Sequence, residues 1–222
     1  MPSFRQPADA AEAELIQDEL RERLVLPSAP IALPRTVVGL DVTYAVGSSR
    51  AVAAAVVVDV ATLAVEEAVT VEGEATFPYV PGLLAFREVP LLLAALERLS
   101  APPALLLCDG YGLAHPRRLG LASHLGVLLD LPSFGVAKTA FIGAAADPGP
   151  GRGESSELVD NGEVVGRVVR TQSGVKPVFV SAGHRIGLAD CAELTVRLSG
   201  RYRIPEPTRQ ADILSRSVLR SG

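Results

Sequence analysis

The pattern of apolar and polar positions predicts a chain that alternates between amphipathic helices and buried strands. Residues 8–24 place Ile16, Leu20 and Leu24 four positions apart among charged side chains, which is the period of a helix with one buried face. A proline-rich segment over 27–34 then interrupts the chain before the first apolar run. We expect the helix over 8–24 to pack against the core as an N-terminal brace.

Three strands are predicted directly after this segment. Residues 36–44, 50–60 and about 64–71 are rich in Val, Ala and Thr, and only a few residues separate one run from the next. Short connections of this kind join antiparallel neighbours. The first part of the core is therefore expected to be an antiparallel meander.

Helices and strands alternate in the rest of the chain. The pattern predicts a helix at about 85–99, a strand at 104–109, a helix near 118–128, a strand at 133–137, paired strands at 164–171 and 177–181, and helices at about 188–198 and 207–219. Three strands, a helix, a strand, a helix and a strand is the element order of a ribonuclease H-like fold, in which the first and fourth strands are neighbours. We expect a single α/β domain over residues 1–222, with a mixed sheet flanked by helices and its core over about 36–200.

Composition agrees with one well-buried domain. The chain has 222 residues, of which 48% are hydrophobic, and it contains no uncharged apolar run of 18 residues and no signal-peptide core at its N-terminus. A cytoplasmic protein with no membrane segment and no obligate protein partner is expected. The two cysteines, Cys108 and Cys191, are far apart and outside any metal-binding spacing, so a zinc site and a structural disulfide are not expected.

Charge is distributed unevenly along the chain. The net charge of −4 argues against a protein that coats nucleic acid without specificity. Residues 1–109, however, hold 7 Lys and Arg against 15 Asp and Glu, whereas residues 110–222 hold 14 against 10. The basic half could contact phosphates, although an uneven scatter of surface charge is an equally ordinary explanation.

Two apolar runs carry a carboxylate near their ends. The run 105–108 leads into Asp109, and the run 36–40 leads into Asp41. If the first and fourth strands are neighbours, these carboxylates fall a few ångströms apart, and two like charges at that distance require protonation or a cation. Hard oxygen ligands suit Mg²⁺, with Mn²⁺ as a substitute, completed by water and substrate phosphate oxygens.

Other polar residues near these runs have both a functional and an ordinary interpretation. Glu88 could be a third metal ligand for a two-metal site or only a partner of the helix dipole. Tyr79, between Pro78 and Pro81, could be held out as a wedge between bases or packed on the core. Asp212 could be a fourth acidic group near the metals or an exposed helix residue.

Several cations and glycines complete the set of candidates. Cations at strand ends beside a metal-bound phosphate would stabilise charge in a transition state, with surface solvation as the alternative. Gly82 and Gly110 with Gly112 would allow close approach of backbone to a ligand, or serve turn geometry. The candidate cations are His115, Arg117, Arg118, Lys138, His184 and Arg185.

Taken together, six blocks of sequence resemble the endonuclease V family of deoxyinosine-directed repair nucleases. They occur in the family's order between about residues 36 and 214. The blocks are 38–42 (VGLDV), 78–88 (PYVPGLLAFRE), 109–124 (DGYGLAHPRRLGLASH), 135–138 (GVAK), 183–185 (GHR) and 205–209 (PEPTR).

The resemblance implies a Mg²⁺-dependent enzyme that nicks DNA at the second phosphodiester bond on the 3′ side of hypoxanthine, leaving 3′-hydroxyl and 5′-phosphate ends. It assigns Asp41, Asp109 and Glu88 to the metal ions, Lys138 to the neighbourhood of the scissile phosphate, and His115 to a catalytic histidine beside the site. It assigns Tyr79 to the wedge, and Gly82, Leu84 and Gly110 to the pocket for the displaced base. We also expect DNA contacts from Pro78, Pro81, Gly112, Arg117, His184 and Arg185. Tyr111 stands where family members more often carry a short amide residue.

Two alternatives remain open from the sequence. Some relatives of this family cleave inosine-containing RNA, and no clear reader of a 2′-hydroxyl group distinguishes the two substrates here. A nucleic-acid binding module without nuclease activity would require a broken acidic set, whereas Asp41, Glu88 and Asp109 are all present.

Overall fold

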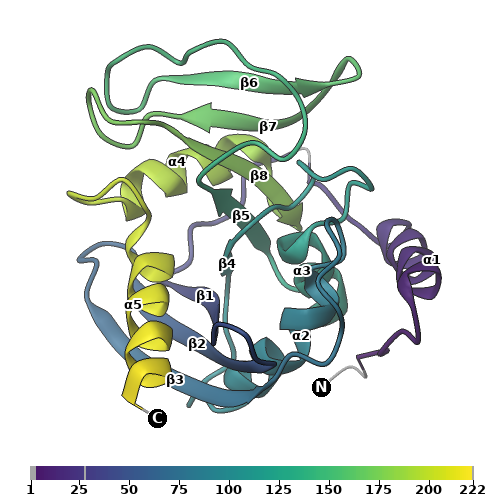
Figure 1. Cartoon of the computed structure of the whole chain (residues 1–222). Coiled ribbons are helices and arrows are strands. Elements are labelled where there is room, and N and C mark those ends of the chain that lie inside the picture. Colours follow the sequence, from purple (N-terminus) through teal and green to yellow (C-terminus); the bar gives the residue numbers. More distant parts are fainter. Residues whose placement is uncertain (1–3, 28, 222) are drawn as a thin grey trace.

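The computed structural model describes residues 4–27 and 29–221, which form thirteen helices and strands (Figure 1). In chain order they are α1 (Ala10–Arg21), β1 (Thr36–Tyr44), β2 (Arg50–Asp59), β3 (Val65–Glu74), α2 (Ala85–Leu96), β4 (Leu106–Asp109), α3 (Leu121–Leu129), β5 (Ser133–Ala137), β6 (Ser155–Asp160), β7 (Glu163–Val169), β8 (Val178–His184), α4 (Leu188–Leu198) and α5 (Glu206–Ser221). No helix in this described part is long and apolar enough to cross a membrane.

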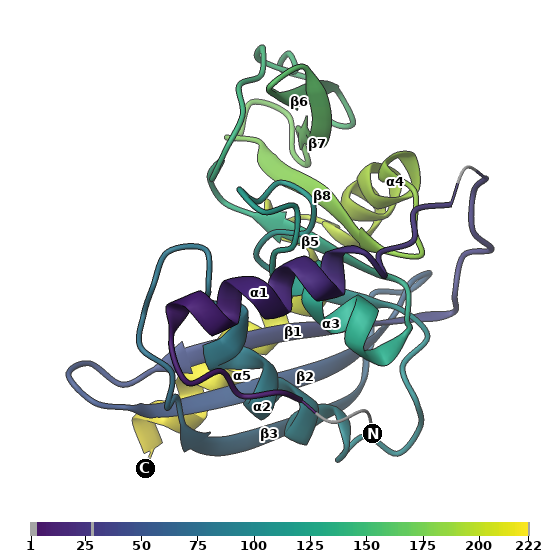
Figure 2. The ribbon, with the colours of Figure 1, turned by 90° about the vertical axis from the view of Figure 1, so that its right-hand side faces the viewer.

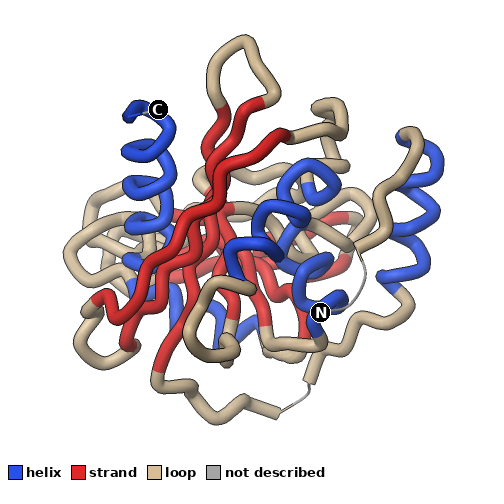
Figure 3. Tube along the Cα trace, turned by 90° about the horizontal axis from the view of Figure 1, so that it is seen from below, coloured by secondary structure: helices blue, strands red, loops and turns tan. Residues whose placement is uncertain are grey.

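One twisted sheet runs through the molecule (Figure 3). Its strand order is β3-β2-β1-β4-β5-β8-β7-β6, with antiparallel pairing in the β1–β3 meander and parallel pairing between β1, β4 and β5. The predicted neighbourhood of the first and fourth strands is therefore confirmed. So is the ribonuclease H-like mixed sheet flanked by helices.

Alternate residues of the central strands face opposite layers of helices. Along β1 and β4, one set packs against α2 and α3 and the other against α4, as expected for side chains that alternate across a strand. Figure 1 shows α5 on the side of the sheet opposite α2 and α3. The central strands lie between these helix layers and are buried on both faces, which explains their continuous apolar sequence.

A glycine allows α5 to approach the sheet. A Cβ atom at Gly39 of β1 would lie 2.1 Å from the backbone carbon of Pro207 in the first turn of α5. No side chain fits in that space, so Gly39 fixes how closely α5 lies over β1. Ala211, one turn later, packs on the small residues Ala54 and Val56 of β2.

The sequence-based prediction missed one strand. Residues 164–171 and 177–181 were expected to be paired strands, and β7 and β8 do pair antiparallel. β6 was not expected, and it forms a tight hairpin with β7 through Asn161 and Gly162. Both turn residues have positive φ, 51° and 80°. Asn-Gly between two strands is a strong hairpin signal, and it could have identified β6.

His124 of α3 is a buried histidine in the aromatic part of the core. Its ring meets that of Phe86 edge-on at 5.1 Å, and Phe4 lies 6.1 Å away. His124 is 1% exposed, and its Nδ1 atom has no hydrogen-bond partner among the described residues. Burial lowers its pKa from 6.5 to about 4, so the ring is neutral in the folded protein at neutral pH.

We expect this residue to make the protein sensitive to acid. Above pH 6.5 the ring is neutral in both states, whereas between pH 6.5 and about 4 only the unfolded chain binds the proton. Acidification across this window should therefore lower the free energy of unfolding through His124 by about 3 kcal/mol. Asp41 and Glu88 titrate in the opposite sense, so the measurement is the difference between the wild type and His124→Phe in chemical denaturation at several pH values. If the free energy of unfolding changed with pH in the same way in the two proteins, His124 would not be the source of the acid sensitivity.

Candidate active site

Two aspartates lie side by side where β4 ends. Leu40 of β1 is in register with Cys108 of β4, so the next residues, Asp41 and Asp109, are neighbours on adjacent parallel strands. Adjacent strands are about 4.8 Å apart, and residues in register project to the same face. Both side chains line one open cavity of about 400 Å³. The structure therefore brings together the two carboxylates that the sequence singled out.

Helix α5 covers one side of this cavity. The hydroxyl of Ser215 donates to Oδ2 of Asp41 at 2.8 Å, and the hydroxyl of Thr43 lies 3.3 Å from the same oxygen. One turn before Ser215, Asp212 lines the cavity and accepts a hydrogen bond from Nε of Arg216 at 2.7 Å. Asp212 is thus placed beside Asp41, and its charge raises the pKa of Asp41.

Helix α2 supplies Glu88 from the other side of the sheet. Glu88 is 6% exposed, and its Oε1 accepts a hydrogen bond from the hydroxyl of Tyr44 at 3.0 Å. Both residues line the cavity that contains Asp41 and Asp109. Three carboxylates from two strands and a helix, with a fourth from α5, therefore converge at one edge of the sheet.

These carboxylates are unfavourable in their charged forms without a cation. Burial, followed by the charges of Asp109 and Asp212, raises the pKa of Asp41 to about 6, although the hydrogen bond from Ser215 opposes the change. Burial and the charges of Asp41 and Asp109 raise the pKa of Glu88 to about 8, against the hydrogen bond from Tyr44. Perturbed carboxyl groups in a cavity are typical of functional sites.

Lys138, just after β5, is a cation in direct contact with this acidic group. Its Nζ atom lies 2.8 Å from Oδ2 of Asp109. Partial burial works to lower the pKa of Lys138, but the hydrogen bond to Asp109 and the charges of Asp109, Asp212 and Asp41 raise it overall. The ammonium group therefore stays charged and neutralises part of the acidic cluster.

The donor set fits Mg²⁺ bound together with substrate. In residues 4–27 and 29–221, no three His, Cys, Asp or Glu side chains already form a complete metal-binding cluster. Mg²⁺ does not require one, because it is commonly held by one or two carboxylates, with water and substrate phosphate oxygens as its other ligands. Asp41 and Asp109 supply that pair, and a cation would offset the burial and the mutual repulsion that together raise the pKa of Asp41.

A second, mostly apolar pocket shares a wall with the acidic cavity. It has a volume of about 180 Å³. Asp109 lines the cavity and the next residue, Gly110, lines the pocket, while Leu121 lines both. Gly82 and Leu84, assigned to the base pocket by sequence, are also in its wall, together with Tyr79, Pro81 and His115.

The loop between β3 and α2 forms one side of this pocket. Val80 to Leu83 make a tight turn, closed by a hydrogen bond from the Leu83 N–H to the Val80 carbonyl at 2.9 Å. Pro81 and Gly82 occupy its centre, and Gly82 has φ +87°, which is the arrangement of a type II turn. Pro78 and Pro81 are exposed, and Tyr79 is 71% exposed. The interpretation of Tyr79 as packed on the core is therefore wrong.

His115 faces the pocket loop, where it makes a structural hydrogen bond. Its Nδ1 accepts from the Arg117 N–H at 3.2 Å, so Nε2 carries the proton and donates to the Gly82 carbonyl at 3.0 Å. Burial lowers the pKa of His115 to about 4, and the charges of Arg117 and Arg118 act in the same direction. A neutral His115 thus fixes the loop at Gly82.

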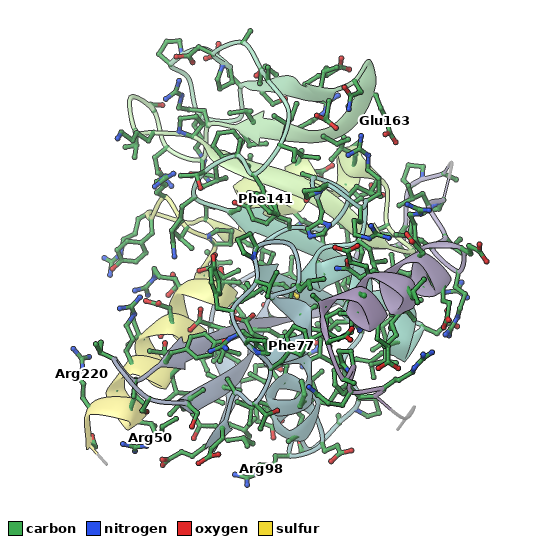
Figure 4. All side chains as sticks on the ribbon, turned by 45° about the vertical axis from the view of Figure 1, so that its right-hand side comes forward. Arg50, Phe77, Arg98, Phe141, Glu163 and Arg220 are labelled. Carbon is green, nitrogen blue, oxygen red and sulfur yellow. The ribbon has the colours of Figure 1, made fainter. Side chains whose placement is uncertain are left out.

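The structure adds two residues that the sequence analysis missed. Phe141 lines the pocket, and its ring lies 5.4 Å from that of Tyr111 and 5.5 Å from that of His115. Figure 4 labels Phe141, which comes from the segment after β5. An aromatic residue three positions after Lys138 was the available signal. Ser215 was also missed, although it lies on the same helix face as Asp212, three positions later.

Four of the residues assigned to DNA by sequence are not brought to this site. His184 pairs with Ser133, the first residue of β5, and therefore lies at the opposite edge of the sheet from Asp109. Arg185, next to it, is paired with Asp130. The other two serve packing: Arg117 is held by Asp18 and Glu14 of α1, and a Cβ at Gly112 would lie 2.0 Å from the Ala182 carbonyl oxygen.

Comparison with known proteins agrees with this architecture. The family model of endonuclease V matches residues 18–213. Endonuclease V of Streptomyces coelicolor is 56% identical over 218 residues, which cover 97% of this chain and 93% of the relative. Among solved structures, endonuclease V of Streptomyces avermitilis matches with 54% identity and a TM-score of 0.93, covering 97% of this chain and 95% of the other.

A further structural match contains nucleic acid. Endonuclease V of Ciona intestinalis, in complex with a 24mer DNA containing an inosine followed by a ribo-adenosine, matches with 30% identity and a TM-score of 0.83. The match covers 95% of this chain and 98% of the other. On the family model, the near full-length identity and the shared structure, this chain belongs to the endonuclease V family, whose members are nucleases.

Proposed function

We propose that this protein is a Mg²⁺-dependent endonuclease that nicks DNA at the second phosphodiester bond on the 3′ side of deoxyinosine, leaving 3′-hydroxyl and 5′-phosphate ends. The observation that carries the proposal is the common wall between the acidic cavity and the apolar pocket, formed by Leu121 and by the consecutive residues Asp109 and Gly110. A displaced base in the pocket would place nearby phosphates at the carboxylates. The inosine in the DNA of the Ciona intestinalis complex supports this substrate.

In this proposal Asp41, Asp109 and Glu88 would hold the metal ions. When bound, divalent cations would supply an activated water and electrostatic stabilisation of the charge that develops on the phosphate oxygens. Ser215 and Thr43 orient the carboxylate of Asp41 by their hydrogen bonds. Each of these contacts prearranges charge before the phosphate arrives, so that little reorganisation is needed during the reaction.

The pocket is suited to recognise hypoxanthine by its edge and its faces. Hypoxanthine carries a carbonyl oxygen and a protonated N1 where adenine carries an amino group and a bare nitrogen, so backbone groups at fixed positions can prefer it. The backbone around Gly82 and Gly110 lines the pocket. Tyr111 and Phe141 offer aromatic faces. A deaminated base pairs weakly, which lowers the cost of displacing it from the duplex.

The test is one incubation series. A 5′-labelled duplex with a single deoxyinosine is expected to give one nicked product with Mg²⁺ or Mn²⁺ and none with EDTA, and no product when deoxyadenosine replaces deoxyinosine. Product length locates the cut, and extension by a polymerase identifies a 3′-hydroxyl end. Equal cleavage of both duplexes, or cleavage in EDTA, would contradict the proposal.

Inosine-containing RNA is the second candidate substrate. The inosine of the Ciona intestinalis complex is followed by a ribonucleotide, which makes a ribose at this position relevant here. Matched DNA, RNA and DNA with a single ribonucleotide after the inosine should be compared by kcat/KM. A preference for the substrates with a 2′-hydroxyl group would assign this protein to RNA.

Tyr79→Ala is expected to lower the selectivity for inosine duplex more than it lowers the rate of the chemical step. The exposed ring at the tip of the two-proline loop is proposed to fill the space left by the displaced base. Stacking of this kind is worth about 1–3 kcal/mol per base, so a loss of about 10-fold or more in the ratio of kcat/KM for inosine and undamaged duplexes is expected. Val46→Ala, an exposed apolar residue in the β1–β2 turn, is the control. Unchanged selectivity in Tyr79→Ala would remove the wedge role.

A further inference from the structure

The apolar face of α1 contains one polar side chain. Ala13, Ile16 and Leu20 occupy positions i, i+3 and i+7 of the buried stripe, and Gln17 occupies position i+4. Gln17 is 1% exposed. An aliphatic residue would satisfy the packing at this position, whereas a buried amide costs free energy unless it is hydrogen-bonded. Its Oε1 atom has no hydrogen-bond partner among the described residues, so the partners of Nε2 indicate what this residue does.

Both partners of Gln17 belong to the wall of the apolar pocket. Its Nε2 atom donates to the Gly82 carbonyl at 2.8 Å and lies 3.4 Å from the Leu119 carbonyl oxygen. Gly82 and Leu119 line the pocket. The Gly82 carbonyl also accepts from His115, so two side chains from distant parts of the chain hold one backbone oxygen.

This oxygen lies in a loop that projects from the core. Phe77 and Leu83, at the two ends of the loop, pack in one apolar cluster with Ile16 and Leu20 of α1. Between these ends, Tyr79 extends into solvent. Figure 2 shows α1 lying across the layer of α2 and α3, and in Figure 4 Phe77 lies below α1. The apolar contacts hold the ends of the loop, and Gln17 holds the turn between them.

A second connection ties α1 to the same region. Arg117 pairs with Asp18 and donates to the Glu14 carbonyl at 3.2 Å. Its backbone N–H in turn donates to Nδ1 of His115. Helix α1 therefore holds Gly82 in two ways. Gln17 donates directly to the Gly82 carbonyl, and Arg117 connects α1 to His115, which donates to the same oxygen. A shift of α1 would move the turn.

We propose that Gln17 is a positioning residue for substrate selection, which acts by fixing Gly82 and, through this turn, the wedge Tyr79. The inference rests on the proposed function, because it assigns α1 to the selection of inosine in that reaction. Gln17 touches neither the carboxylates nor Lys138. Its removal is expected to affect selection of the base and to leave the chemical step unchanged.

Gln17→Met is the variant that tests this role. Methionine has a similar length and shape but no donor, and it suits the apolar stripe, so α1 is expected to remain docked. Loss of the hydrogen bonds should raise KM for inosine duplex and lower the selectivity ratio by about 5- to 10-fold, with kcat unchanged within about twofold. Leu15→Ala, on the exposed face of the same helix, is the control and should leave both parameters unchanged. Thermal unfolding of both variants checks that α1 remains docked.

A double-mutant cycle separates positioning from general damage. If Gln17 acts through the wedge, Gln17→Met should change selectivity in the wild type and hardly at all in Tyr79→Ala. A 2-aminopurine beside the inosine should report less base displacement in Gln17→Met than in Leu15→Ala. Equal effects in both backgrounds, or wild-type selectivity in Gln17→Met, would overturn the inference. If the wild type itself does not select inosine, the proposed function fails instead.

Discussion

Replacing Asp41 or Asp109 by alanine is expected to abolish nicking of inosine-containing duplex. The two carboxylates follow residues that are in register on the parallel strands β1 and β4, and both line one cavity, so the loss of either one breaks the adjacent pair. Metal stabilisation of a phosphodiester transition state is worth several kcal/mol, which corresponds to a loss of roughly 10³-fold or more in kcat. Single-turnover cleavage with saturating enzyme measures this loss directly.

The Asp41→Ala and Asp109→Ala variants should still bind inosine-containing duplex, although they do not cleave it. The apolar pocket and Tyr79 are unchanged by these substitutions, so fluorescence anisotropy should detect retained preference for inosine duplex. Glu157→Gln is the matched control, because Glu157 is an exposed acidic residue on β6. Cleavage at the wild-type rate in Asp41→Ala or Asp109→Ala would refute the metal assignment, and lost cleavage in Glu157→Gln would indicate a general charge effect.

The pairing of Asp41 with Asp109 could be predicted from sequence for a specific physical reason. Apolar runs that are buried on both faces indicate central strands, and the element order determines which of them are neighbours. A carboxylate after each run then falls at a common edge. Glu88 could also be placed, because the start of the helix after the third strand lies at the same edge.

His184 and Arg185 show where this reasoning fails. They follow an apolar run in the same way as Asp109, but β8 runs antiparallel to β5, so its end lies at the other edge of the sheet. The direction of a strand depends on the connection before it, and here that connection includes β6 and β7. An apolar run carries no information about direction, so a polar residue at its end can be assigned to the wrong edge.

Contacts between distant segments could not be predicted from local sequence patterns either. The place of Ser215 beside Asp41 depends on the fit of Gly39 against Pro207, which no periodicity encodes. The role of Gln17 depends on a loop 65 residues later in the chain. In both cases the informative signal was an exception to a pattern, a glycine within a strand and an amide within an apolar stripe.

The charge on Lys138 should be nearly as important for catalysis as the carboxylates. In this structure its ammonium group lies 2.8 Å from Asp109. A metal ion held by Asp109 would compete for the same oxygen, and Lys138 would then be free to contact phosphate oxygens on which charge develops. Removing one such preorganised donor typically costs about 10²–10³-fold in rate. We therefore expect Lys138→Met to lower kcat by about 10²-fold.

The metal requirement should distinguish this role from metal binding. If Lys138 competes with the cation for Asp109, its removal leaves the Mg²⁺ concentration for half-maximal activity unchanged or lower, while kcat falls. Loss of a metal ligand would have the opposite signature, with a higher Mg²⁺ requirement. Lys176→Met is the matched control, since Lys176 is exposed and is the only other lysine in the sequence. A rate for Lys138→Met within threefold of that control would exclude a part for the ammonium group in the chemical step.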